Sequence, residues 1–393
     1  MLSPLLDVYK RCNLEFTSGK GSYLKSKDGK KYLDFAAGIA VNALGYAHPR
    51  LSSAITKAAK KPWHVSNLYH IAGQENLAQK LVANSSCDQV FFCNSGAETI
   101  ETAVKIIRKN AAASNNPKRH KIITFEHAFH GRTMTAISAG GSKKYQEGYA
   151  PLVSGFVNVP LKHAKFPELK KYVKADVAAI ALEPIQGEGG VNVFSKKFLK
   201  ELYEFCQAEK ILLLVDEVQC GMGRTGKLFH YQWSGIKPDI ICVAKGIGGG
   251  FPLGACLVKK EYGKAMTPGS HGGTYGGSPL AMSVGNAVID EILKPNFLHR
   301  VQENGKFIKS ELIKFQVKFP ELIKDVRGEG LMLGLEINGD YTRFAAELRA
   351  AKLLTVPASN NVIRIIPPLN IKKKDLQLGL NIIKNTLENF SND

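Results

Sequence analysis

The sequence contains no apolar run long enough to cross a bilayer. Its longest unbroken run of Ile, Leu and Val extends only from Ile211 to Val215, whereas a membrane-spanning helix needs about 20 apolar residues. The first sixteen residues lack a sustained apolar segment and include Asp7 and Glu15, which are unlike a secretory or transit peptide. We therefore expect a cytoplasmic protein without a membrane partner.

Recognisable metal and disulfide patterns are also missing. The chain has 7 cysteines with no C-x-x-C pair, and none of its 10 histidines lies in an H-E-x-x-H motif. An odd number of scattered cysteines is typical of reduced, mostly buried thiols. His127 and His130 have a spacing that suits a metal, but no third ligand lies close to them in the sequence. The sequence predicts no metal site.

Acidic residues are few, since 34 Asp and Glu face 53 Lys and Arg, which gives a net charge of +19. Only 11 of the 53 basic residues are arginine, the side chain that most often reads bases and grips phosphates. A lysine-rich excess without interleaved aromatic residues is typical of a solvated surface that modestly steers anionic substrates. We expect no nucleic-acid partner.

The 393 residues, of which 44% are hydrophobic, suggest a globular chain of more than one domain. From about 75 to 260, strand-like apolar runs alternate with helical patterns such as 97–109, which favours an α/β fold with a parallel sheet covered on both faces. The runs cover 90–93, 121–125, 177–182, 211–215 and 240–244. We expect a large domain at 51–275 and a smaller one at 276–393, with the N-terminal segment 1–50 packed beside it.

Polar residues follow the apolar runs, and ligands of parallel sheets bind at the carboxyl ends of the strands. Lys245 ends one run and Asp216 ends another. A desolvated lysine has the lowered pKa that an amine needs to form an imine with an aldehyde. A carboxylate beside a pyridine nitrogen keeps that nitrogen protonated. Each residue alone also suits an ordinary strand end, but the pair favours pyridoxal phosphate as the cofactor.

Two further segments suit the same cofactor. Ser95, Gly96 and Ala97 lie between a strand and a helix, where exposed backbone N–H groups bind phosphate. Phe129 offers a flat ring for stacking on a pyridine, and Arg132 offers a fork of donors for a carboxylate. Taken singly, these residues are as typical of a helix cap, a core aromatic and a surface arginine.

A glycine motif at 221–226 fits G-x-G-x-x-G and follows a strand. The segment after it, KLFHYQW, does not open an apolar helix, as a dinucleotide-binding motif requires. The sequence therefore does not predict a nicotinamide site there.

Several strings occur together in an order that is specific to one family. They are CNSGAET, FHGRT, EPIQGEGGV, DEVQCGMGRTG, AKGIGGGFPLGA, HGGTYGGSPL and VRGEGLMLGLE. Over essentially its whole length the chain resembles the class III (subgroup II) aminotransferases of PLP fold type I. The resemblance implies a large domain with a mostly parallel seven-stranded sheet and a smaller α+β domain.

The resemblance also implies roles for individual residues. For the cofactor they are Lys245 as the Schiff-base lysine, Asp216 at the pyridine nitrogen, Gln219 near the phenolic oxygen, Phe129 as the stacking ring, Ser95, Gly96 and Ala97 at the phosphate, and Thr274 at the phosphate of a neighbouring subunit. For the substrates they are Arg132 and Gly273 at acetylornithine, and Arg364 at the α-carboxylate of glutamate. Glu183 and Glu188 are the two acids of EPIQGEGG, and Glu188 is the one that pairs with Arg364. The active unit is therefore expected to be a homodimer with active sites at the subunit interface.

Within the family, WHVSNLY together with FHGRT is most similar to members that transfer the δ-amino group of N-acetylornithine to 2-oxoglutarate, a step of arginine biosynthesis. Ornithine, succinylornithine, succinyl-diaminopimelate and 4-aminobutyrate are alternative donors, since substrate choice depends on the rim at 63–69, Arg132 and 271–274. A non-catalytic basic binding protein is a further alternative, although it would be expected to lack Lys245 or Asp216. The chain departs from the family at Gly273, usually Ser, and at Ser278, usually Asn.

Overall fold

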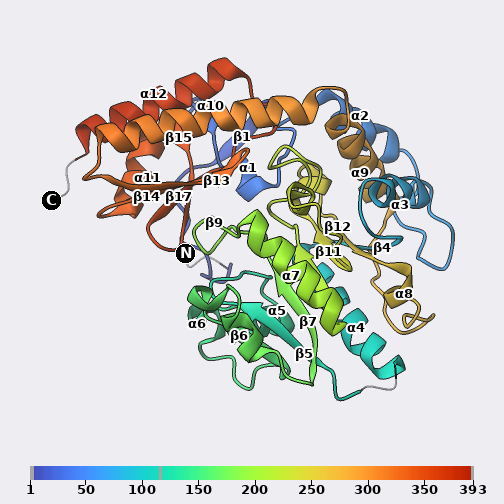
Figure 1. The fold of residues 1–393 in the computed structure, drawn as a ribbon. Helices are drawn as coiled ribbons and strands as arrows, with labels where there is room; N and C mark the ends of the chain where they lie inside the picture. Colours follow the sequence, from blue (N-terminus) through green and yellow to red (C-terminus); the bar gives the residue numbers. More distant parts are fainter. Residues whose placement is uncertain (1–3, 115–116, 391–393) are drawn as a thin grey trace.

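A seven-stranded sheet forms the centre of the protein, in the order β4-β12-β11-β10-β7-β5-β6 (Figure 1). The structure is a computed structural model that describes residues 4–114 and 117–390. The strands are β4 (Gln89–Cys93), β5 (Lys121–Phe125), β6 (Phe156–Val159), β7 (Val177–Leu182), β10 (Leu212–Asp216), β11 (Ile240–Val243) and β12 (Gly254–Val258). Only β12 runs antiparallel to its neighbours, which confirms the mostly parallel seven-stranded sheet.

Both faces of this sheet are covered, as its continuous apolar strands require. Side chains of a strand alternate between the two faces. Leu214 of β10 therefore belongs to the core that includes α4 (Gly96–Ala113), whereas Val215 belongs to the core that includes α7 (Lys196–Glu209). Because β4 runs in the same direction as the parallel strands, the residues that follow β4, β5, β7, β10 and β11 lie along one edge of the sheet.

A second, antiparallel sheet has the order β13-β14-β17-β16. Its strands are β13 (Ile323–Glu329), β14 (Met332–Ile337), β16 (Val356–Ala358) and β17 (Val362–Ile365). The helices α10 (Phe297–Lys318) and α12 (Lys373–Asn389) run side by side over it, and α11 (Tyr341–Ala350) packs against α12 (Figure 1). This is the smaller α+β part of the chain.

The N-terminal strands join the C-terminal part of the chain rather than the central sheet. β1 (Phe16–Lys20), β2 (Tyr23–Ser26) and β3 (Lys31–Asp34) form an antiparallel ribbon, and β3 pairs in parallel with β15 (Leu353–Leu354). The hydroxyl of Tyr23 donates a hydrogen bond of 2.6 Å to Asp375 of α12. The chain after β3 then returns to the edge of the central sheet.

The remaining elements connect and cover these sheets. They are α1 (Ala37–Ala40), α2 (Pro49–Ala58), α3 (Gln74–Ala83), α5 (Met134–Ala139), α6 (Lys143–Gln146), β8 (Ile185–Gln186), β9 (Asn192–Val193), α8 (Lys260–Gly263), α9 (Pro279–Ile292) and short 3-10 turns, among them η4 (Lys245–Gly248). α9 packs against α2 and α3. Among the described residues, no helix is both long and apolar enough to cross a membrane.

Candidate active site

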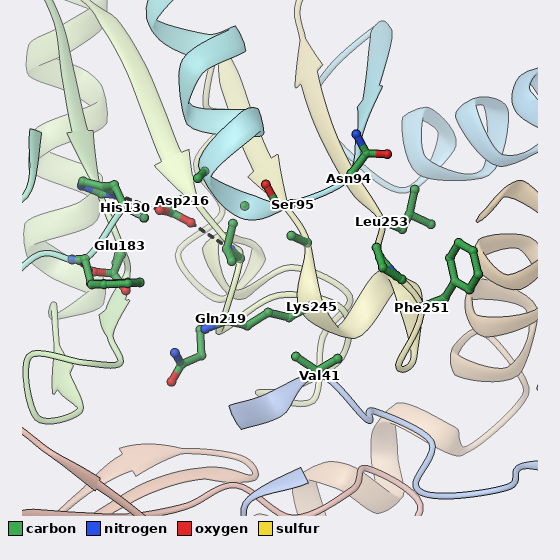
Figure 2. A pocket seen from close by; sticks show the side chains of 17 residues that line it. Val41, Asn94, Ser95, His130, Glu183, Asp216, Gln219, Lys245, Phe251 and Leu253 are labelled. Atoms are coloured by element: carbon green, nitrogen blue, oxygen red, sulfur yellow. Dashed lines mark hydrogen bonds and ion pairs between the residues drawn. The ribbon is translucent and has the colours of Figure 1, made fainter. Parts of the chain in front are cut away.

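A cavity of about 260 Å³ opens at the carboxyl edge of the central sheet (Figure 2). Most of the residues that the sequence assigns to a cofactor line it together, although they come from four separate segments. These are Ser95, Gly96, Ala97, Phe129, Asp216, Gln219 and Lys245. The cavity wall also includes Val41 from the N-terminal segment, and His130 and Glu183, whose roles are described below.

Lys245 follows β11 and begins the turn η4 in a strained conformation. Its φ is +48°, a left-handed value that costs a non-glycine residue about 1–3 kcal/mol and is found most often at functional sites. Burial lowers the pKa of the Lys245 ammonium; the charge of Glu188 opposes this shift and that of Arg364 supports it. An amine with a lowered pKa is uncharged more of the time and is therefore a better nucleophile.

Asp216 is held rigidly at the end of β10. Its Oδ1 accepts a hydrogen bond from the Val218 N–H at 3.0 Å, and its Oδ2 accepts one from Nδ1 of His130 at 2.7 Å. Both side chains are almost completely buried. Burial opposes a charge on His130, but the hydrogen bond and charge of Asp216 prevail and raise the pKa of His130. Asp216 is thereby held in one orientation at the cavity wall.

His130 is the residue at this site whose role the sequence alone did not reveal. There it was considered only as a metal ligand with His127, and in the described part of the chain no three His, Cys, Asp or Glu form a metal-binding group. One signal in the sequence could have indicated this role. A buried Asp at a strand end needs a hydrogen-bond donor, and His130 is a donor next to Phe129, in the loop after a neighbouring strand. Its Nε2 has no hydrogen-bond partner among the described residues.

Replacing His130 by Phe should destabilise the protein by about 1–3 kcal/mol, because Asp216 then loses a buried donor. The deficit should depend on pH. Since the pKa of His130 is raised above its ordinary 6.5, the charged pair contributes fully below that pH, and its contribution is lost as the pH rises through the raised value. Thermal unfolding at pH 6 and at pH 9 measures this. A deficit that grows with pH would contradict it.

A second carboxyl group lies next to Asp216. Glu183 follows β7 and accepts hydrogen bonds from the backbone N–H groups of Phe129 at 2.8 Å and Gly187 at 3.3 Å. Burial, together with the charge of Asp216, raises the pKa of Glu183 to about 7. Glu183 therefore orders the loop that carries Phe129, and close to neutral pH it adds less negative charge to the cavity than an exposed glutamate would.

The first turn of α4 forms another part of the cavity wall. The Ser95 hydroxyl caps the helix by accepting a hydrogen bond from the Glu98 N–H at 3.3 Å. Gly96 is required by close packing, since a Cβ there would lie 2.9 Å from Cγ1 of Val218. The unpaired N–H groups and the positive end of the helix dipole thus lie close to the Asp216 segment, where a phosphate would bind.

Arg132 lies outside this wall. Phe129 lines the cavity, but the guanidinium of Arg132 is exposed and lies 3.9 Å from the ring centroid of Tyr145 and 5.5 Å from that of Phe129. Stacking on Tyr145 holds the arginine at the rim through cation–π attraction. Its guanidinium therefore lies at the rim of the cavity rather than in the cavity wall.

Glu188 and Arg364 form a two-pronged ion pair beside the cavity. Nη1 of Arg364 lies 2.7 Å from Oε1 of Glu188, and Nη2 lies 3.0 Å from Oε2. Nη1 also donates to Oε1 of Gln219 at 3.1 Å. The Arg364 side chain is 1% exposed and that of Glu188 is 23% exposed. The arginine is therefore fixed within β17, while its carboxylate partner lies on a more accessible loop between β8 and β9.

Gly273 and Thr274 do not line the cavity of their own chain. Both are exposed, in the segment between α8 and α9. The side-chain amide of Asn67 donates to the carbonyl oxygens of Gly273 at 3.0 Å and Gly276 at 3.1 Å. The two rim segments that the sequence associates with substrate choice are thus joined directly.

The glycine motif at 221–226 is a structural connection. Arg224 within it is 2% exposed and its Nη1 donates to the carbonyl oxygens of Leu331 at 3.1 Å and Pro367 at 2.5 Å. The motif therefore joins the central sheet to the smaller one.

The groups around the cavity fit a pyridine aldehyde that carries a phosphate. A lysine of lowered pKa matches the aldehyde, and a fixed carboxylate matches the ring nitrogen. The first turn of an eighteen-residue helix matches the phosphate, and Phe129 supplies an aromatic surface. Each of these four features therefore has a counterpart in such a molecule.

Comparison with known proteins indicates the same class of protein as the fold and the cavity. The sequence model of the family "Aminotransferase class-III" matches residues 8–387, and the chain belongs to this family. An acetylornithine aminotransferase of Mesorhizobium japonicum is 48% identical over 382 residues, which cover 97% of this chain and 95% of that protein.

Solved structures agree with this assignment. The crystal structure of N-acetylornithine aminotransferase from Stenotrophomonas maltophilia has a TM-score of 0.85 and 33% identity, covering 97% of each chain. A structure of ornithine aminotransferase from Toxoplasma gondii, described as having partial occupancy of PLP at its active site, has a TM-score of 0.93 and 29% identity. It covers 98% of this chain and 92% of the other.

Proposed function

We propose that the protein transfers the δ-amino group of N-acetyl-L-ornithine to 2-oxoglutarate, giving N-acetyl-L-glutamate 5-semialdehyde and L-glutamate, as a step of arginine biosynthesis in the cytoplasm. The observation that carries this proposal is the Glu188–Arg364 pair beside the cavity that Lys245 and Asp216 line. Glu188 can cover or uncover the positive charge of Arg364. The glutamate half-reaction brings an α-carboxylate to this arginine, and the acetylornithine half-reaction does not.

Pyridoxal phosphate is the cofactor, and when bound it supplies an aldehyde carbon for amine exchange and a ring that withdraws electrons. Lys245 would hold it covalently, Asp216 would hold its ring nitrogen, and the turn Ser95–Ala97 would hold its phosphate. Phe129 would stack on one face of the ring. These assignments rest on the shared cavity and on the chemistry of each group.

Lys245 also has a second task. Nζ of Lys245, when it is not bonded to the cofactor, would also accept a proton from the substrate carbon next to nitrogen. Its lowered pKa favours the uncharged form needed for this step. Arg132 at the rim would bind the distal carboxylate of acetylornithine, with Gly273 contacting the substrate next to it.

Glu188 and Arg364 would let one site serve two kinds of substrate. Arg364 would bind the α-carboxylate of glutamate after Glu188 moves away. While acetylornithine reacts at its other end, Glu188 would neutralise the arginine, since an unpaired buried charge costs several kcal/mol. Because Glu188 is more exposed than Arg364, Glu188 is the partner that moves.

A Glu188→Ala variant should slow the acetylornithine half-reaction about tenfold or more, and the glutamate half-reaction much less. Without Glu188 the charge of Arg364 stays uncovered when no α-carboxylate is present. Single-turnover spectra with each donor separate the two halves. The control is Glu347→Ala, which removes an exposed glutamate paired with Arg343 on α11. Equal slowing of both halves would contradict the switch.

We further propose a homodimer whose active sites lie at the subunit interface, with Thr274 reaching the phosphate bound by a second copy of the chain. In support, large apolar side chains are exposed near the same rim, namely Trp63, Leu68, Tyr69 and Tyr275. Exposed apolar patches of this kind mark association surfaces. We also propose domain boundaries near 50 and 275. Sedimentation of the purified protein tests the dimer.

A panel of amino donors tests the substrate. With 2-oxoglutarate as acceptor, kcat/KM should be at least tenfold higher for N-acetylornithine than for ornithine, succinylornithine, succinyl-diaminopimelate or 4-aminobutyrate. A preference for free ornithine would instead assign the chain to a different member of its family. A protein that takes up no pyridoxal phosphate would refute the proposal as a whole.

A further inference from the structure

His271 connects the segment between α8 and α9 to helix α4. Its Nε2 lies 3.0 Å from Oγ1 of Thr102, and its Nδ1 lies 3.2 Å from Nζ of Lys105. Its ring also packs against Phe91 of β4, with 4.8 Å between ring centroids and 34° between planes. A side chain in a connecting segment is thus held by two polar contacts and one aromatic contact.

These contacts specify the protonation state of the imidazole. The Lys105 ammonium has only donors, so Nδ1 of His271 must accept. Thr102 Oγ1 donates to the carbonyl oxygen of Glu98 at 2.8 Å, so it is free to accept from Nε2–H of His271. The bonds run in one direction from Lys105 to Glu98, and they require a neutral imidazole with its proton on Nε2.

The position of His271 in the sequence gives this anchor its importance. It comes directly before Gly272 and Gly273, which have the greatest backbone freedom of any residue type, and then Thr274. The side-chain amide of Asn67 holds the carbonyl oxygens of Gly273 and Gly276, on the two sides of Thr274. Without the His271 anchor the backbone at Gly272 would be freer, and ordering Thr274 against a ligand would cost more conformational entropy.

We propose that His271 is a positioning residue that fixes Thr274 for the active site of a neighbouring copy of the chain, not for the site of its own chain. This inference rests on the proposed homodimer. It concerns how firmly the second subunit holds the phosphate of the cofactor, and it assigns His271 no contact with the substrate.

Hybrid dimers with two different purification tags separate the two sites. In the first hybrid, one chain carries Lys245→Ala and the other His271→Ala, so the one site with Lys245 receives its Thr274 from a chain with intact His271. In the second, a wild-type chain is paired with a chain that carries both substitutions. The reference pairs a wild-type chain with Lys245→Ala alone.

We expect the first hybrid to match the reference and the second to bind pyridoxal phosphate about tenfold more weakly in equilibrium dialysis. Equal weakening of both hybrids, or weakening of the first only, would overturn the inference. If His271→Ala does not fold, His271→Phe replaces it, because its ring can still pack against Phe91 but makes neither polar contact. An active wild-type monomer in sedimentation would refute the dimer itself, which is a separate outcome.

A pH profile distinguishes this anchor from simple packing. Burial first, and then the charge of Lys105, lower the pKa of His271, whereas Glu101 and Glu98 act in the opposite direction. Cofactor affinity should therefore fall only at acid pH, where His271 gains a proton and repels Lys105. In Lys105→Met, which has no ammonium to repel, this acid fall should be lost. In a His271→Gln background the acid fall should be absent whether residue 105 is Lys or Met; a fall that persists there would contradict the role of His271.

Discussion

Replacing Lys245 by Ala should lower aminotransferase activity by at least about 10⁴-fold, the upper end of what one positioned general base contributes. The variant loses both the covalent attachment point and the base that moves the proton. The purified wild-type protein should show the visible absorption band of its covalently held cofactor, and the variant should not. Steady-state assays and absorption spectra measure both effects.

The loss should arise from chemistry rather than from unfolding. Lys245 occupies a left-handed backbone conformation with φ of +48°. A control with a long side chain at this position tests whether the fold tolerates the substitution. Lys245→Arg retains much of the length but does not form the covalent link, and it should be as inactive as Lys245→Ala with a circular dichroism spectrum like that of the wild type. Substantial activity in either variant would contradict the assignment of Lys245.

Replacing Asp216 by Asn should lower kcat by about 10³-fold, the order seen when one preorganised electrostatic group is removed. The amide keeps the shape of the side chain and can still accept from the Val218 N–H, but it has no charge to hold a proton on the ring nitrogen. Cofactor should still be taken up through Lys245. The change should therefore appear in kcat far more than in cofactor content.

His130→Phe is the matched control for this variant. It removes the 2.7 Å contact to Asp216 but leaves the carboxylate in place, so it should reduce kcat less than Asp216→Asn does. If Asp216→Asn stayed within tenfold of the wild type, Asp216 would not be the partner of the ring nitrogen. If His130→Phe were the more damaging variant, the imidazole would have the larger role.

The order of strands and helices in the central region followed from local pattern. Runs such as 177–182 and 240–244 are apolar throughout because both faces of the sheet are buried, and the structure places β7 and β11 there. Strand β12 was not evident from pattern alone, because GACLV begins with glycine and directly follows a glycine-rich turn. It pairs antiparallel with β11, the strand before it, and with β4, which is distant in the sequence.

The residue types at the strand ends were likewise visible in the sequence. Lys245 and Asp216 stand directly after or at the end of buried strands, and one edge of a parallel sheet gathers such positions. This much follows from chain direction and burial alone. The resemblance to a family added roles for Gln219, Glu188 and Arg364, which the local pattern does not single out. Their roles toward cofactor and substrate remain predictions.

Only the tertiary structure decided which side chains meet. His130 was a candidate metal ligand in the sequence and is a hydrogen-bond donor to Asp216 in the structure, 86 residues away. Glu188 and Arg364 are separated by 176 residues, and His271 and Thr102 by 169. The sequence by itself determined most of the central strands and helices and the kinds of chemical group at the sheet edge, because these depend on neighbours along the chain. The pairing of those groups depends on packing between distant segments, and for that reason only the folded chain specifies it.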